Sequence, residues 1–170
     1  MSRIASLRTQ RLSASPLHAE DFKEICLLHQ DVEIMRHMGG VRTEEQSRPW
    51  ICENLHHWHL HGFGLWTFRD IVDGTFVGRC GLRRVDVGGD KEVELGYVAM
   101  RPYWHKGLGI EMARAVLRTS FASDAGNIIA LIRPQNLMSR RLAHRAGFHF
   151  ERNVTWKSTP AMLYRKIKSL

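Results

Sequence analysis

The most informative stretch of the sequence is Trp104-His105-Lys106-Gly107-Leu108-Gly109. It follows a predicted strand that ends near Met100 and precedes a segment in which Ala113, Val116 and Leu117 recur at helical spacing. The first amide N–H groups of a helix have no partner inside it, and glycines let a ligand approach them closely. The stretch therefore predicts an anion-binding turn at the start of a helix.

Residues that are absent from the turn exclude two known classes of phosphate-binding site. A P-loop needs Lys and Ser or Thr after its second glycine, but Ile110-Glu111 stands there. A dinucleotide-binding turn needs a third glycine, and that position is Met112. Lys106 adds a positive charge where diphosphate oxygens would sit. A coenzyme diphosphate remains the functional hypothesis, and a purely structural turn is its alternative.

Upstream of this turn, extended segments predict an antiparallel meander. The strands cover 65–68, 76–82 and 93–100, and the turns Asp73-Gly74 and Gly88-Gly89-Asp90 separate them. Two helices should precede the meander, after a first strand.

That first strand is expected over Thr9–Ala14. Thr43 and Gln46 have the spacing of a capping box, which would begin the second helix. Pro49 lacks an amide, so Ser47 is an alternative start.

Downstream of the turn and its helix, Ile128–Ile132 suits a buried strand, and residues 136–146 suit a helix. Residues 148–150 and 162–167 then suit two final strands. No repeat or linker interrupts the order, so residues 1–170 are expected to form one domain.

Charge and composition limit the function classes. The chain carries 25 Lys and Arg against 17 Asp and Glu, a net charge of +8 that favours anionic ligands. The cations are scattered, which makes a nucleic-acid arm unlikely. The first four residues lack an apolar segment, so a cytoplasmic protein without a membrane span is expected.

A cluster of Cys52 with the histidines at 56, 57, 59 and 61 has partial metal-ligand spacing. Neither a carboxylate nor a second Cys/His pair completes it, so we expect a polar helix face and no metal.

Several motifs together resemble the GNAT acetyltransferases, and most closely the Rim-type N-terminal acetyltransferases of ribosomal proteins. The motifs are Glu94-Leu95-Gly96-Tyr97, Tyr103-Trp104-x-Lys106-Gly107-x-Gly109-x-Glu111, Asn136-x-x-Ser139 and Ala146-Gly147-Phe148, with Arg11-Leu12 and Gly62-Phe63-Gly64-Leu65-Trp66. The resemblance spans nearly the whole chain.

The resemblance implies an α+β, or mixed α/β, GNAT fold. Its mostly antiparallel twisted sheet has about seven strands, splayed between the fourth and the fifth, with about four flanking helices. Acetyl-CoA would lie in the splay. Main-chain amides would contact it at Val98, Met100, Lys106, Gly107, Leu108, Gly109 and Ile110, and side chains at Asn136 and Ser139.

The resemblance also suggests catalytic roles. Glu94 is the candidate base that removes a proton from the attacking amine, and a solvated carboxylate opposite Arg83 or Arg84 is its alternative. Many family members carry a tyrosine acid where this chain has Ala143. Ser139 would instead stabilise the leaving thiolate, or merely cap its helix.

The expected function is transfer of acetyl from acetyl-CoA to a primary amine. A protein or peptide N-terminus is the first candidate acceptor, and a polyamine or aminoglycoside the second. A non-catalytic CoA-binding protein and a basic nucleic-acid-binding module are the alternatives from other classes. A homodimer is left open.

Overall fold

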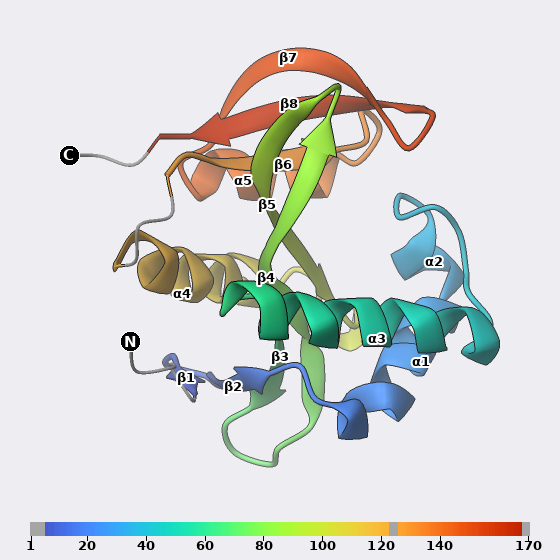
Figure 1. The fold of residues 1–170 in the computed structure, drawn as a ribbon. Coiled ribbons are helices and arrows are strands. Elements are labelled where there is room, and N and C mark those ends of the chain that lie inside the picture. Colours follow the sequence, from blue (N-terminus) through green and yellow to red (C-terminus); the bar gives the residue numbers. More distant parts are fainter. Residues whose placement is uncertain (1–5, 123–125, 168–170) are drawn as a thin grey trace.

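A computed structural model describes residues 6–122 and 126–167. Within these ranges, eight strands form one sheet in the order β1-β2-β3-β4-β5-β6-β8-β7 (Figure 1). Neighbouring strands are antiparallel except β5 and β6, which are parallel. The strands are β1 Leu7–Arg8, β2 Leu12–Pro16, β3 Leu65–Asp70, β4 Phe76–Val87, β5 Asp90–Ala99, β6 Ile128–Ile132, β7 His149–Trp156 and β8 Thr159–Lys166. The expected mixed, mostly antiparallel sheet is confirmed.

Five α-helices occur in the described ranges, and side-chain caps explain where several of them begin. They are α1 Phe22–Gln30, α2 Val32–Met35, α3 Glu44–His61, α4 Leu108–Ala122 and α5 Leu137–Arg145. Asp31 caps α2, and Asn136 caps α5. None of the helices in the described residues is both long and apolar enough to cross a membrane.

The start of α3 settles the choice between two predicted boundaries. Thr43 and Gln46 form both hydrogen bonds of the capping box, so the helix begins at Glu44. The alternative start at Ser47 is wrong, because the box satisfies the first amides and the helix continues through Pro49.

The first strand differs from its prediction. Residues 9–11 form a turn between β1 and β2, in which the Thr9 amide donates to the Leu12 carbonyl at 2.9 Å. The Thr9 hydroxyl and the Arg11 guanidinium bind Glu111 of α4, far along the chain. A local sequence pattern does not contain that partner, so it could not show that the strand is interrupted.

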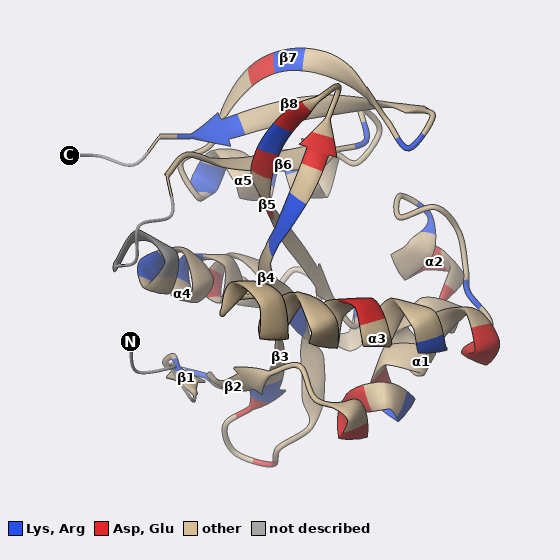
Figure 2. Ribbon diagram, in the orientation of Figure 1, with Lys and Arg blue, Asp and Glu red and all other residues tan. Residues whose placement is uncertain are grey.

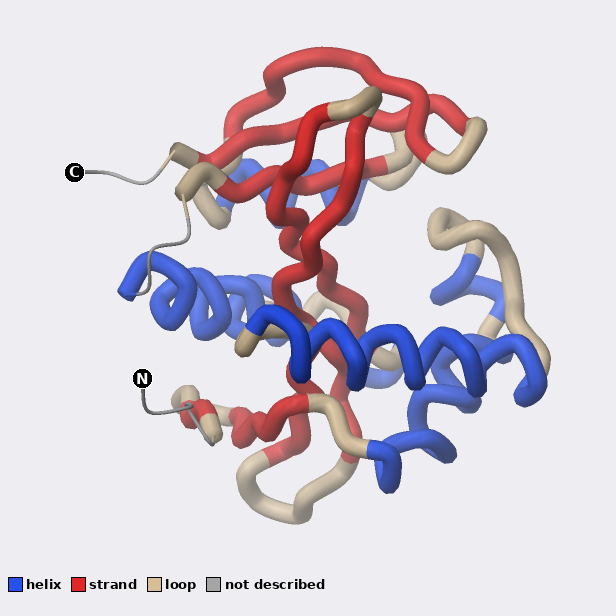
Figure 3. The backbone as a smooth tube through the Cα atoms, in the orientation of Figure 1, coloured by secondary structure: helices blue, strands red, loops and turns tan. Residues whose placement is uncertain are grey.

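The long hairpin β4–β5 is the centre of the molecule, and helices lie on both of its sides (Figure 3). One apolar cluster joins the sheet to α4 and includes Met112 and Val116. A second lies under α1 to α3 and includes Leu28 and Ile51. The two faces of the hairpin are therefore buried separately, and polar side chains between the clusters need partners of their own.

The parallel neighbours β5 and β6 separate almost at once. Across the described residues their register contains one pair, Glu94 with Ile129. Beyond it, β5 runs on through Gly96 to Ala99 without a partner strand on that side, while β4 pairs with it throughout. This opening is the expected splay between the fourth and fifth predicted strands.

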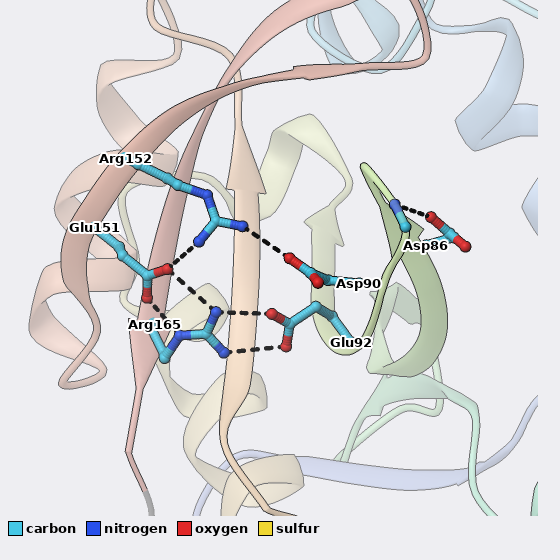
Figure 4. A network of polar contacts seen from close by, with 7 residues as sticks. Asp86, Asp90, Glu92, Glu151, Arg152 and Arg165 are labelled. Atoms are coloured by element: carbon cyan, nitrogen blue, oxygen red, sulfur yellow. Dashed lines mark hydrogen bonds and ion pairs between the residues drawn. The ribbon is translucent and has the colours of Figure 1, made fainter.

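An ionic network holds the closed end of the splay. Arg165 of β8 binds both carboxylate oxygens of Glu92 of β5, at 2.7 and 3.0 Å, across the intervening β6. Glu151 of β7 binds the same guanidinium, as Figure 4 shows. A bidentate guanidinium–carboxylate pair fixes orientation as well as distance. The network therefore holds the two halves of the sheet together just before they part.

A buried histidine fixes α1 against α3. The Nδ1 of His29 lies 2.9 Å from the Ser47 hydroxyl, and its Nε2 lies 3.3 Å from a guanidinium nitrogen of Arg42. Ser47 donates its own proton to the Thr43 carbonyl, so the imidazole donates from Nδ1 and accepts at Nε2. Burial, and then the charges of Arg79 and Arg42, lower the pKa of His29 from 6.5 to about 3.

This histidine predicts a pH dependence of folding. The unfolded chain protonates it near pH 6.5 and the folded chain only near pH 3, so stability is complete above 6.5 and falls as the pH drops below it. His29 contributes up to about 1.4 kcal/mol per pH unit to the change of the unfolding free energy with pH. Between pH 7 and pH 5, the free energy of unfolding measured by urea denaturation should decrease less steeply with falling pH in His29→Gln than in wild type. Exposed His59→Gln is the control, and equal slopes in all three proteins would contradict the assignment.

Candidate functional site

The turn before α4 presents its amides as the sequence predicts. His105 and Gly107 have φ of 61° and 75°, which turn the chain sharply between Trp104 and Leu108. The Glu111 amide makes the first bond back into the turn, to the Gly107 carbonyl at 3.2 Å. Among the described residues, none accepts a hydrogen bond from the five amides of 106–110. Five donors thus converge at the positive end of a helix.

Glu111 and Arg11 hold this turn in place. Arg11 donates to the Lys106 carbonyl at 2.8 Å and forms an ion pair with Glu111 at 2.6 Å. Burial raises the pKa of Glu111, but hydrogen bonds from Thr9 and Arg11 outweigh it and leave the pKa below its ordinary value. The carboxylate is therefore charged at neutral pH. Both residues belong to the motifs of the resemblance, and the structure brings them together.

The two glycines of the turn have different structural roles. Gly107 needs its freedom because its φ is positive, and a Cβ there would meet only the end of Arg11, at 3.5 Å. A Cβ on Gly109 would lie 2.8 Å from Leu142 of α5, so this glycine lets α4 and α5 pack closely. Close approach of a ligand therefore explains the glycine at 107 but not the glycine at 109.

The main chain of β5 differs from the expected donor pattern. The Met100 amide donates to the Val77 carbonyl of β4 at 2.8 Å, so it is engaged within the sheet. Amide directions alternate along a strand, which turns Val98 toward β4 as well. Tyr97 and Ala99 therefore face the splay, and the Ala99 carbonyl on that side accepts from the Trp104 indole at 2.8 Å.

Glu94 lies at the last residue pair before the splay opens. Its side chain is 8% exposed and accepts a hydrogen bond from Arg83 of β4 at 3.0 Å. Arg83 is thus the partner of Glu94, as the alternative of a solvated carboxylate expected. The carboxylate is buried, however, and not solvated. A buried carboxylate beside an open edge of the sheet is suited to receive a proton from a ligand.

Asn136 and Ser139 lie across the splay, at the start of α5. The Asn136 side chain caps the helix by accepting from the Ser139 amide at 3.1 Å. The Ser139 hydroxyl donates to the Tyr97 hydroxyl at 2.9 Å, and Tyr97 donates to the Ser139 carbonyl at 2.9 Å. Asn136 is therefore the helix cap, and the Ser139 hydroxyl does not cap the helix. Burial raises the pKa of Tyr97, so its phenol is protonated at neutral pH.

Sequence reasoning missed two groups of this site. Tyr97 was noticed within a motif but was given no role, although it follows Glu94 by three residues and so lies on the opposite face of β5. Arg79 was not noticed, yet it lies two residues before Gly81 and four before Arg83, on the face that carries Glu94. Assigning alternate side chains of the predicted hairpin to its two faces would have identified both residues.

Among the histidines of α3 with partial metal-ligand spacing, His57 makes a structural contact. The His57 Nδ1 lies 2.9 Å from the Phe63 carbonyl, and its Nε2 accepts from the Arg84 amide at 3.0 Å. Both ring nitrogens are occupied, and desolvation first of all lowers the pKa of this imidazole to about 4. Over the described part of the chain, no group of three or more His, Cys, Asp or Glu residues is placed to bind a metal ion.

Comparison with known proteins identifies the family of the fold. Residues 11–149 match the model of the acetyltransferase (GNAT) domain. The chain is 30% identical over 141 residues to the uncharacterized protein YkkB of Bacillus subtilis (strain 168), which covers 82% of each protein. An acetyltransferase from Agrobacterium tumefaciens superposes with a TM-score of 0.85 at 23% identity, covering 98% of this chain and 96% of that one.

More distant structures share the fold and differ in their acceptors. A RimL ribosomal alpha-N-protein acetyltransferase, solved with coenzyme A, superposes with a TM-score of 0.78 at 13% identity, over 95% of this chain and 97% of that one. A spermidine N-acetyltransferase from Vibrio cholerae, solved with CoA and spermine, gives 0.75 at 14%, over 94% and 97%. The fold alone therefore does not choose the acceptor.

Gly107 supplies a test of the anion-binding turn. A β-branched residue is strongly disfavoured at φ 75°, so Gly107→Val should displace the amides and raise the calorimetric Kd for CoA at least about tenfold. Gly88→Val is the matched control, because Gly88 has φ 64°, open surroundings and a place in the β4–β5 turn, at the opposite end of that hairpin from the turn before α4. The control should lose stability but keep its CoA affinity. Equal affinities of the two variants would show that the turn does not bind the coenzyme.

Proposed function

The chain belongs to the acetyltransferase (GNAT) family and is an acetyl-CoA-dependent N-acetyltransferase, and we propose that its acceptor is the N-terminal amine of a protein or peptide. The observation that carries the site assignment is the set of five unpartnered amides at 106–110, next to the open edge of β5. We propose that these amides and Lys106 bind the diphosphate of acetyl-CoA.

The pantetheine arm then follows the open edge of β5. We assign its main-chain contacts to Tyr97 and Ala99 in place of Val98 and Met100, because the Met100 amide is bonded to β4. An extended ligand that adds to a strand edge satisfies main-chain groups that the sheet leaves free. This arrangement brings the thioester to Gly96, between Glu94 and Tyr97.

Transfer begins when an uncharged amine attacks the thioester carbonyl carbon. A new C–N bond forms, the amine loses a proton, and the C–S bond then breaks to release the CoA thiolate. We propose that Glu94 accepts the proton, directly or through water. An α-amino group has a pKa near ~8 and is partly neutral at physiological pH, so a carboxylate is a sufficient base for an N-terminus.

The leaving thiolate needs a donor, which we place at the hydroxyl pair of Ser139 and Tyr97. Ala143 occupies the position of the family's usual tyrosine acid and is fully buried. Tyr97 brings a protonated phenol to the same helix from the opposite side of the splay. Asn136 supports the pair by capping the turn that carries Ser139.

Thiol release from acetyl-CoA tests the proposal. With peptides that have a free N-terminus, wild type should turn over faster than with spermidine or an aminoglycoside. Glu94→Gln should lower kcat by roughly 10²-fold or more near pH 7, and the deficit should shrink above the amine pKa of ~8, where the amine needs no base. No turnover with any amine would leave only a CoA-binding protein, and a deficit independent of pH would limit Glu94 to holding Arg83.

The hydroxyl pair makes a separate prediction. Tyr97→Phe and Ser139→Ala should each lower kcat about tenfold, because each removes one member of a single donor unit. The double variant should then be no slower than the slower single variant. Calorimetric CoA affinity should change little in all three. Independent, multiplying losses would show that the two hydroxyls act separately.

A further inference from the structure

Arg79 is a buried cation to which the described part of the chain offers no polar partner. Its side chain is 4% exposed, and none of the described residues accepts a hydrogen bond from its buried Nε. The guanidinium lies 4.7 Å from the centre of the Trp50 ring of α3, a contact that supports the charge on one face only. A buried guanidinium ordinarily has a carboxylate or several carbonyl groups around it.

The charges near Arg79 are mostly of its own sign. Arg83 follows on the same face of β4, and its Nε is also buried without a partner in the described structure. Arg42, in the loop before α3, contacts the Nε2 of His29 at 3.3 Å. Burial, and then the charges of Arg83 and Arg42, lower the pKa of Arg79 to about 9. Glu94 offsets part of this charge, but it is already bound to Arg83.

These cations surround the place where an acceptor must enter. The pairs Arg79–Val98 and Arg83–Glu94 lie on either side of the pair Gly81–Gly96 in the β4–β5 ladder. A Cβ added to Gly96 would meet nothing within 4 Å. Gly96 therefore faces open space between the candidate base and the buried guanidinium. In Figure 2 the upper part of β4 has a basic stretch that lies above α3 in this view, followed by an acidic end of the strand.

The turn between β7 and β8 adds a further cation. Lys157 is exposed, yet desolvation first and then the charge of Arg83 lower its pKa. Glu94 and Glu53 act on the same ammonium in the opposite direction. Four cations from three separate segments thus act on one another here, one from the loop before α3, two from β4 and one from the β7–β8 turn.

We propose that the acceptor carries an anionic group, a carboxylate or a phosphate, that binds the guanidinium groups of Arg79, Arg83 and Arg42 while its amine faces Glu94. The inference rests on the proposed function and adds that the acceptor is acidic: a peptide with an acidic residue near its N-terminal amine or, in place of a peptide, a free amino acid whose own carboxylate is the anion. The ligand's negative charge supplies the partner that Arg79 lacks. Polycationic amines would meet repulsion instead.

Matched acceptor pairs test this in thiol-release assays with saturating acetyl-CoA. The pairs are an amino acid against its amide, and Ala-Glu against Ala-Gln peptides, so that each arm changes one charge. In wild type, the acidic member of at least one pair should have a KM tenfold lower or more, and which pair responds distinguishes a free amino acid from a peptide. In Arg79→Met the advantage should disappear, while exposed Arg84→Met on the same strand should keep it. Equal KM values within both pairs in wild type, or an advantage that survives in Arg79→Met, would overturn the inference and leave the acetyltransferase assignment standing.

A second measurement does not depend on turnover. In CoA-saturated protein the diphosphate site is filled, so added inorganic phosphate should raise the Tm of wild type and of Arg84→Met more than that of Arg79→Met. Replacing a partnerless buried charge by an apolar side chain of similar size is often neutral or stabilising, so the variant should fold. Equal phosphate shifts in the three proteins would contradict the anion site even if no acceptor in the panel reacts. Failure of CoA itself to bind would instead refute the proposed function.

Discussion

Two strands that part after one residue pair leave hydrogen-bonding groups that the sheet cannot satisfy. β4 holds one edge of β5 along its whole length, and Arg165 holds Glu92 at the end where β6 still lies alongside. Past Glu94 the other edge of β5 is open. The chain then leaves β5 through the turn at 104–107, so the open strand edge and the unpartnered amides of α4 are continuous. The proposed binding of an extended, diphosphate-bearing coenzyme rests on that continuity.

The surroundings of the opening separate two kinds of chemistry. On one face of β5, Glu94 lies in a cluster of guanidinium groups that favours negative charge. On the other face, Tyr97 and Ser139 form a neutral hydroxyl pair against α5. The group proposed to accept a proton from the amine and the pair proposed to stabilise the thiolate thus lie on opposite faces of one strand. The alternation of side chains along β5 is sufficient to keep them apart.

Sequence patterns predicted the parts of the fold that depend on near neighbours in the chain. The capping box at Thr43, the meander and the turn before α4 are of this kind, since each rests on residues a few positions apart. The interruption at Thr9 was not predictable, because it depends on Glu111. In the site, Glu94 and the amides of 106–110 could be selected from motifs, whereas the isolation of Arg79 is a property of packing. The sequence also predicted the strand that ends near Met100, but not that the Met100 amide points toward β4.

Amide chemical shifts report whether the main chain at 106–110 binds the coenzyme's diphosphate, as we propose. In ¹⁵N-labelled protein titrated with CoA, the largest shifts should occur at the amides of 106–110, with smaller ones at Tyr97 and Ala99. Titration with pantetheine, which lacks the diphosphate, should leave 106–110 nearly unchanged. If CoA binds while those five amides keep their free-state shifts, the account is wrong.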